Sequence, residues 1–227
     1  CSSEQTGILI DGIHGGASGG FSPMPENEME QIEEKEGIFD HLHGLLFTHL
    51  HIDHFKAKRV MAFLNQYPDT AIWGPGLEKR HLLEDRENGG DVRFRIGDFR
   101  FRAYQTDHSG EPYRNEPHLS VLVKNEQTGG NVLVSGDAQF YPELAGRIRE
   151  ENGRVDMVFV MIYQLIEKSS IQFLKELDPG RVLLYHRPDP AEDTNHLLSV
   201  IRSVLRHDPL SGKPIEVPEH RTWIDLT

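Results

Sequence analysis

The sequence predicts a layered domain of the α/β or α+β class. Short β-type runs alternate with helical patterns along the chain, which is typical of sheets covered by helices. With 227 residues, of which 37% are hydrophobic and 26% are charged, the chain can bury a core that needs no disulfide. No Pro/Ser-rich linker or change of composition divides it. We therefore expect a single domain over residues 1–227.

The first elements lead to the most distinctive part of the sequence. A strand is expected at Ile8 to Asp11, followed by a Gly-rich loop at Gly12 to Gly20. The acidic stretch Glu26 to Glu36 is interpreted as a surface helix. A buried strand at Leu45 to Thr48 comes next, and apolar residues at helical spacing then predict an amphipathic helix that begins near Asp53.

The later elements follow from the same patterns. Two pairs of β-type runs are each joined by a Gly-containing turn, which predicts two hairpins. The expected elements are a strand at Ala71 to Trp73, a helix at Gly76 to Asp85, a hairpin of Val92 to Ile96 with Phe99 to Thr106, a hairpin of Leu119 to Val123 with Val132 to Ser135, a helix at Pro142 to Glu151, a strand at Met157 to Met161, a helix at Ser169 to Leu177, a strand at Val182 to Tyr185 and a helix at Thr194 to His207.

Charge and cysteine content restrict the function. The formal net charge of −12 repels polyanions, so we expect no nonspecific binding of nucleic acid. No apolar run approaches the ~20 residues of a membrane-spanning helix. Cys1 is the only cysteine, so thiolates cannot form a zinc site, and any metal must be held by carboxylates and by some of the 13 histidines.

The N-terminus leaves two locations open. A native chain starts with Met, so we expect a tag, processing or missing residues upstream of Cys1, and we expect the chain to lack part of its first strand. The preferred expectation is a cytoplasmic protein. The start Cys1-Ser2-Ser3 also resembles that of a mature bacterial lipoprotein, which is the alternative.

The run from Thr48 to His54 has the properties of a metal site. In an extended segment residues two apart share a face, so His49 and His51 can present imidazole nitrogens to one ion. Asp53 and His54 follow at the turn into the helix and can face a second ion. A surface cluster of histidines is the alternative, but the position between a buried strand and a helix favours metal binding.

This run resembles the hallmark of the metallo-β-lactamase superfamily, His-x-His-x-Asp-His at the end of a strand. Other parts of that family's pattern follow in order over nearly the whole chain. The matching segments are Ile10-Asp11-Gly12, Thr106-Asp107-His108-Ser109, Leu133-Val134-Ser135-Gly136-Asp137 and Leu184-Tyr185-His186.

The resemblance implies a fold and a set of ligands. The implied fold is a four-layer αββα sandwich of the α+β class, in which two mixed β-sheets are flanked by helices and the metals lie at one edge. The implied cofactors are two divalent metal ions, zinc or alternatively iron or manganese. The implied ligands are His49, His51 and His108 on the first ion, Asp53, His54 and His186 on the second, and Asp137 between the two.

The resemblance also implies an activity. It is metal-dependent hydrolysis by a metal-bridging hydroxide, with Asp53 orienting the nucleophile or carrying its proton. Asp137 stands where the commonest class B β-lactamases carry a cysteine, which argues against that subgroup. The expected substrate is a small phosphodiester, ester or lactone, because the relatives that process RNA need a basic arm for which the chain shows no candidate insertion.

Three other functions remain open. They are a thioester hydrolase of the glyoxalase II type, an iron-dependent redox enzyme of the same superfamily, and a noncatalytic metal-binding sensing module. The ligand set also has competitors. His118 is an alternative to His108, His14 can approach the site from the Gly-rich loop, and the pair His41 and His43 has the spacing of His49 and His51 but no carboxylate after it.

Overall fold

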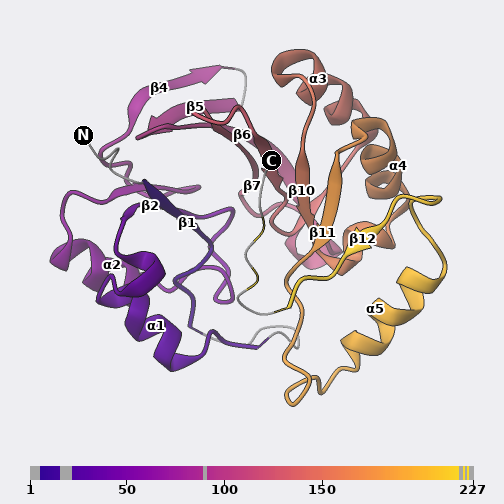
Figure 1. Ribbon diagram of the computed structural model, residues 1–227, viewed down its shortest axis with the longest axis horizontal. Coiled ribbons are helices and arrows are strands. Elements are labelled where there is room, and N and C mark those ends of the chain that lie inside the picture. The colour runs from indigo at the N-terminus through magenta and orange to yellow at the C-terminus, as the bar shows by residue number, and fades with distance from the viewer. Residues whose placement is uncertain (1–5, 16–21, 89–90, 220–221, 223, 225–227) are drawn as a thin grey trace.

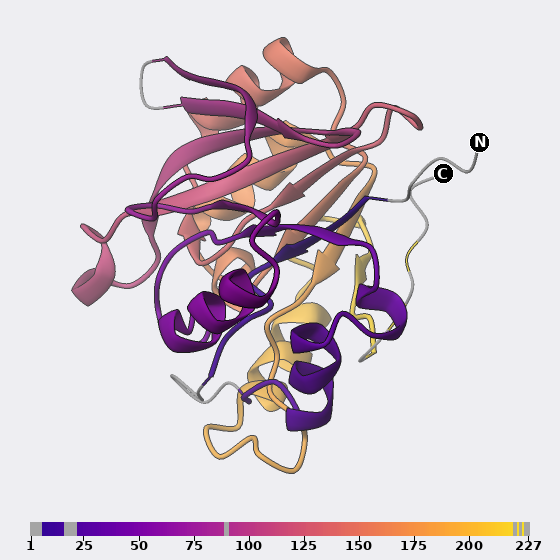
Figure 2. The same cartoon turned by 90° about the vertical axis from the view of Figure 1, so that its left-hand side faces the viewer.

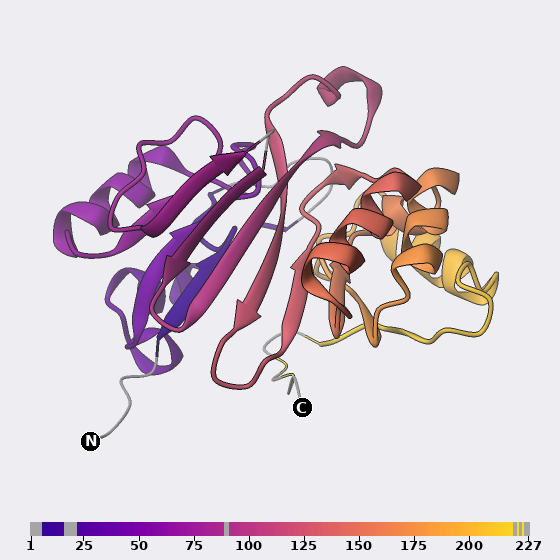
Figure 3. The same ribbon diagram turned by 90° about the horizontal axis from the view of Figure 1, so that it is seen from above.

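Two β-sheets face each other between two layers of helices, which is the four-layer αββα arrangement expected from the sequence (Figures 1 and 3). The computed structural model describes residues 6–15, 22–88, 91–219, 222 and 224. Cys1 and part of the Gly-rich loop lie outside these residues.

The smaller sheet holds the strands that lead into the histidine motif. Its order is β1 (Gly7–Ile10), β2 (Leu42–Leu46) and β3 (Ala71–Trp73), and both strand pairs are parallel. An isolated antiparallel bridge joins Ile72 to Arg80. Helices α1 (Glu26–Glu33) and α2 (Ala57–Gln66) lie against one face of this sheet (Figure 2).

The larger sheet is mixed and curves around the smaller one. Its strands are, in spatial order, β12 (Ile215–Glu216), β11 (Arg181–Leu184), β10 (Met157–Val160), β8 (Asn131–Val134), β7 (His118–Asn125), β6 (Phe99–His108), β5 (Asp91–Ile96) and β4 (Leu83–Asn88). Strands β4 to β8 pair antiparallel, and β8, β10, β11 and β12 pair parallel. The short strand β9 (Ala138–Gln139) pairs with the end of β6.

Helices α3 (Pro142–Asn152), α4 (Lys168–Leu177) and α5 (Leu197–Arg206) cover the outer face of the larger sheet. Three 3₁₀ turns join elements: η1 (Gly37–Phe39), η2 (Glu111–Tyr113) and η3 (Ile162–Leu165). The segment that contains η2 projects beyond the sheets (Figure 2).

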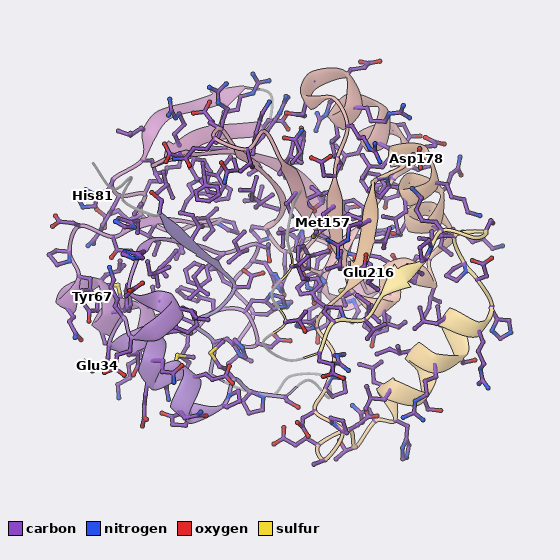
Figure 4. The ribbon with its side chains drawn as sticks, viewed as in Figure 1. Glu34, Tyr67, His81, Met157, Asp178 and Glu216 are labelled. Carbon is purple, nitrogen blue, oxygen red and sulfur yellow. The ribbon has the colours of Figure 1, made fainter. Side chains whose placement is uncertain are left out.

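Apolar side chains fill each of the three interfaces between the layers. The core between the sheets includes Leu46 and Trp73 from the smaller sheet and Phe94, Phe101 and Val121 from the larger one. In Figure 4 the buried Met157 of β10 lies near the middle of the molecule, whereas the exposed His81 and Asp178 lie at its edge.

The structure corrects one predicted element and two predicted helix starts. The helix predicted at Gly76 to Asp85 is wrong, because this segment is a turn followed by the start of β4. Gly76 has a φ of 72°, which a helix does not allow. Helix α2 begins at Ala57 instead of near Asp53, since the intervening residues form a turn. Helix α5 begins at Leu197, where the Asp193 carboxylate accepts hydrogen bonds from the backbone N–H groups of Leu197 and Leu198.

The two predicted hairpins are confirmed. Gly97 and Gly129, in their turns, have φ values of 55° and 79°, which glycine adopts without the strain of a Cβ atom. None of the described helices combines the length and the apolar composition that crossing a bilayer requires.

Candidate metal centre

The segment between β2 and α2 folds into a turn that gathers the histidine motif. The backbone N–H groups of His54 and Phe55 both donate to the carbonyl of His51, at 2.9 and 2.8 Å. Asp53 and His54 are buried in this turn, and His49 is buried at the end of the strand. These residues therefore form a turn and not the first part of helix α2. The turn keeps the carboxylate of Asp53 and the imidazole of His54 inside the protein.

Asp11, at the end of β1, fixes two neighbours of the motif. Its carboxylate accepts hydrogen bonds from the Thr48 backbone N–H at 2.7 Å, from Thr48 Oγ1 at 2.6 Å and from His54 Nδ1 at 2.9 Å. Because Thr48 Oγ1 donates to Asp11, it can accept from His49 Nδ1, which lies 3.0 Å away. These bonds leave the Nε2 atoms of His49 and His54 as the nitrogens that can bind an ion.

Three further ligand candidates reach the same place because β6, β8 and β11 run in the same direction. His108 is the last residue of β6, Asp137 follows β8, and His186 follows β11. Strands that run in the same direction end at the same edge of a sheet, so their C-terminal residues converge. The His108 Nδ1 atom donates to the Ser109 carbonyl at 2.6 Å, which leaves Nε2 facing inward.

The structure brings all seven predicted ligands into overlapping groups. The candidate ligand atoms within each group lie within 4.8 Å of one another. The groups are His49 with His51 and His108, His49 with His54 and Asp137, and Asp53 with His54 and His186. The first and third groups match the two coordination sets expected from the resemblance, and the group that contains Asp137 shares a residue with each of them.

The chemistry of this pocket fits metal ions. The atoms His49 Nε2, His108 Nε2 and Asp53 Oδ1 are buried and have no hydrogen-bond partner among the described residues. Leaving buried polar atoms unpaired costs free energy unless another partner is bound. Imidazole and carboxylate ligands suit Zn²⁺, Fe²⁺ and Mn²⁺, so the donor set and its unpaired atoms are consistent with ions of this kind.

Electrostatics concentrate opposite charges at the same point. Burial opposes protonation of His54, but the carboxylates of Asp11 and Asp137 outweigh it and raise the pKa of His54 to about 10. Burial would also raise the pKa of Asp137, yet His54 and His186 lower it well below its usual range. Burial, assisted by His54, lowers the pKa of His49 and keeps it neutral. A cation bound here would take the place of the proton on His54.

His118 lies beside the ligand groups but is not a member of them. Its Nε2 atom accepts the backbone N–H of Asp137 at 2.9 Å, and its Nδ1 atom lies 2.7 Å from Thr106 Oγ1. Burial lowers the pKa of His118 to about 3, so the ring is neutral. Both nitrogens are occupied, and the ring supports the turn that carries Asp137.

Other residues singled out in the sequence take different places. His41 and His43 are exposed and lie outside the three candidate ligand groups. His14 is half-buried and lines a cavity beside Asp53 and His186.

Two carboxylates near the site were not found by sequence reasoning. Glu116 Oε2 lies 2.5 Å from His51 Nε2, which leaves Nδ1 of His51 free to face the other ligands. Glu167 accepts from Ser109 Oγ at 2.6 Å and supports the segment after His108. Both contacts join residues more than 50 positions apart in the chain. No spacing of residues in the sequence predicts them.

Comparison with known proteins identifies the fold. No protein-family model matches the chain, and no curated protein matches it by sequence. Solved structures do match it. Human tRNase Z, short form, is 13% identical with a TM-score of 0.56 over 98% of this chain and 97% of that one. The metallo-β-lactamase fold protein YhfI from Bacillus subtilis is 15% identical with a TM-score of 0.50, covering 79% of this chain and 74% of that one.

A third similar structure has a different printed activity. CmlA, a diiron β-hydroxylase from Streptomyces venezuelae, is 17% identical with a TM-score of 0.53 and covers 77% of this chain but 43% of that one. At such identities the likeness concerns the fold, and function has to be argued from the site.

Proposed function

We propose that this chain, whose fold is that of the metallo-β-lactamase proteins, is a hydrolase that uses two divalent metal ions on a small phosphodiester, ester or lactone. The observation that carries the proposal is the overlap of three ligand groups at one edge of the sandwich. One tetrahedral site uses fewer than seven protein ligands, so the set supports two ions.

The ligands are assigned by group. His49, His51 and His108 would hold the first ion, Asp53, His54 and His186 the second, and Asp137 both. Zinc is the expected metal, with iron or manganese as alternatives. When bound, such a pair of ions supplies Lewis acidity and lowers the pKa of water at the site.

The residues around the ligands have separate tasks. Asp11 fixes the ring of His54, and the Ser109 carbonyl fixes the ring of His108, so each presents Nε2. Asp53 has one carboxylate oxygen that is buried and unpaired among the described residues. We assign it to orient the attacking water and to hold the proton that the water loses.

The substrate is proposed to be small. A net charge of −12 disfavours long polyanions. A cavity of about 390 Å³ opens onto Asp53 and His186, which is the size of a small-molecule site. This supports a compact substrate rather than a nucleic acid.

The test combines metal analysis with turnover. Gently purified protein should contain about two transition-metal ions per chain, because the ligand set is that of a two-ion site. It should also hydrolyse at least one of a 4-nitrophenyl ester, bis(4-nitrophenyl) phosphate and a simple lactone. The double variant His49→Ala/His51→Ala should lose metal and activity.

The upstream pair provides a matched control. His41→Ala/His43→Ala removes two exposed imidazoles at the same spacing and should leave metal content and turnover unchanged. Protein without transition metal that gains neither stability nor activity when metal is added would contradict the proposal. Metal binding with oxygen uptake but no hydrolysis would instead indicate redox chemistry.

A further inference from the structure

The cavity beside Asp53 and His186 has a composition of its own. Its volume is about 390 Å³, and it is lined by His14, Asp53 and three segments: residues 22–25 with Glu28 around the start of α1, residues 184–190 from the last residue of β11 onward, and residues 218–219. Hydrogen bonds tie these segments together. The Asp189 backbone N–H donates to Ser22 Oγ at 2.8 Å, and Arg187 Nη2 donates to the Pro218 carbonyl at 2.9 Å.

Prolines are prominent in the wall of the cavity. Its prolines are Pro23, Pro25, Pro188, Pro190 and Pro218. Proline has no backbone N–H and a fixed φ, so these positions give a rigid surface of apolar rings and carbonyl oxygens. Met24 and Leu184 add further apolar area.

The charges around the cavity are mainly negative. The carboxylates in its lining are Glu28, Asp189, Glu219 and the site residue Asp53. Apart from histidines, Arg187 is the one basic residue among the described lining residues. The N-terminus of α1 would favour an anion, but Glu26 and Glu28 already lie in that first turn. Among the described lining residues carboxylates therefore outnumber guanidinium groups, which disfavours an anionic group.

We infer that this cavity receives an uncharged or cationic, largely apolar group, so that the substrate is a neutral or cationic ester or lactone rather than an anionic one. The inference rests on the proposed hydrolase function, because it assigns the cavity to the part of the substrate that extends from the reacting carbonyl. A phosphodiester with an anionic substituent in this position is the competing outcome.

The experiment compares matched probes on the metal-loaded protein. The probes are the 4-nitrophenyl esters of hexanoic acid, of 6-(trimethylammonio)hexanoic acid and of adipic acid, which carry an uncharged, a cationic and an anionic end. The kcat/KM for the uncharged and cationic esters should exceed that for the anionic ester by about tenfold or more, equivalent to ~1.4 kcal/mol. Equal or better turnover of the anionic ester would overturn the inference.

Cavity variants connect the charge preference to these residues. Asp189→Asn/Glu219→Gln removes two carboxylates and should improve the anionic ester relative to the uncharged one several-fold. Glu34→Gln/Asp40→Asn removes the same charge from exposed positions and should leave the ratio unchanged. If both double variants change the ratio equally, overall charge sets the preference and the cavity assignment is wrong.

A binding measurement separates this inference from the proposed function. Calorimetry with the anilides of the same three acids, on metal-loaded and on metal-depleted protein, reports binding without hydrolysis. The anionic anilide should bind at least several-fold more weakly in both forms, and Asp189→Asn/Glu219→Gln should reduce that difference. The same order without ester hydrolysis would support the cavity assignment and refute the hydrolase, whereas hydrolysis without the order would do the reverse.

Discussion

His108 and His118 occupy the facing ends of neighbouring strands, and their ring centroids are 5.5 Å apart. The sequence alone did not decide which of the two histidines is the candidate metal ligand. The hydrogen bonds distinguish them, because His108 keeps a buried nitrogen unpaired among the described residues whereas both nitrogens of His118 have neighbours.

His118→Ala is expected to retain both metals, and His108→Ala is expected to lose one. The first change removes hydrogen bonds worth about 1–3 kcal/mol when their partners stay buried, so its stability should fall. Elemental analysis of folded protein, checked by circular dichroism, measures the metal content. A variant pair that behaves in the opposite way would move the ligand assignment to His118.

Asp53→Ala is expected to keep the fold and lose hydrolysis. Asp53 lies in the turn between β2 and α2, and it does not belong to any of the three apolar cores between the layers. As a ligand and proton carrier its loss should lower kcat by about 10²-fold or more. Steady-state kinetics on a substrate that the parent protein hydrolyses, with the exposed Asp40→Ala as control, provides the measurement. Unchanged kcat would show that another group handles the proton.

At the scale of elements, the turn between β8 and β9 is tightly packed against the site. Gly136 has a φ of 58°, and a Cβ atom there would lie 2.6 Å from His118 Nε2 and 2.7 Å from Thr48 Oγ1. Both neighbours are buried and hydrogen-bonded, so they cannot move without breaking other contacts.

Gly136→Ala is expected to destabilise the protein by about 3 kcal/mol or more, as strain at φ adds to overpacking. Gly129→Ala separates the two causes. Gly129 also has a positive φ of 79°, but nothing lies within 4 Å of the added Cβ, so about 1 kcal/mol is expected from the backbone conformation alone. Urea unfolding of both variants without added metal gives the comparison. Equal losses would mean that the turn can relax.

Sequence patterns predicted most of the helices and strands, because these elements depend on residues that are close together in the chain. The hairpins were predicted from glycine in their turns, and the seven candidate ligands from a local motif and its resemblance to a known pattern. The segment after Gly76 was misread, because Pro75, Gly76 and a short charged run gave too little periodicity to tell a helix from a turn and a strand. Tertiary pairing of β4 with β5 decides its structure.

The contacts that support the ligands could not be predicted in this way. The bond between Glu116 and His51 and the bond between His118 and the Asp137 backbone exist only after distant strands have paired. Neither contact corresponds to a recognisable spacing of residues in the sequence. The polarity of the cavity could not be predicted from the sequence either, because the three segments that line it are far apart in the chain.

At the scale of the whole molecule, the negative charge leads to a prediction about substrate size. The fold alone does not decide it, since a tRNase Z matches the chain over 98% of its length. At physiological salt, at least one small ester, lactone or phosphodiester should be cleaved and structured RNA should not, because a net charge of −12 opposes the approach of a polyanion. Gel analysis of RNA beside chromogenic assays tests this. Efficient RNA cleavage without small-substrate turnover would refute it.

The ligands also enter the site at different stages of synthesis. The group of His49, His51 and His108 is available once residue 108 has been synthesised, whereas the group of Asp53, His54 and His186 must wait for the end of β11. Closing the second group joins residues more than 130 positions apart, a non-local contact that slows folding through the entropy of loop closure. The order of synthesis therefore makes the first candidate ligand group available on the nascent chain before the second one.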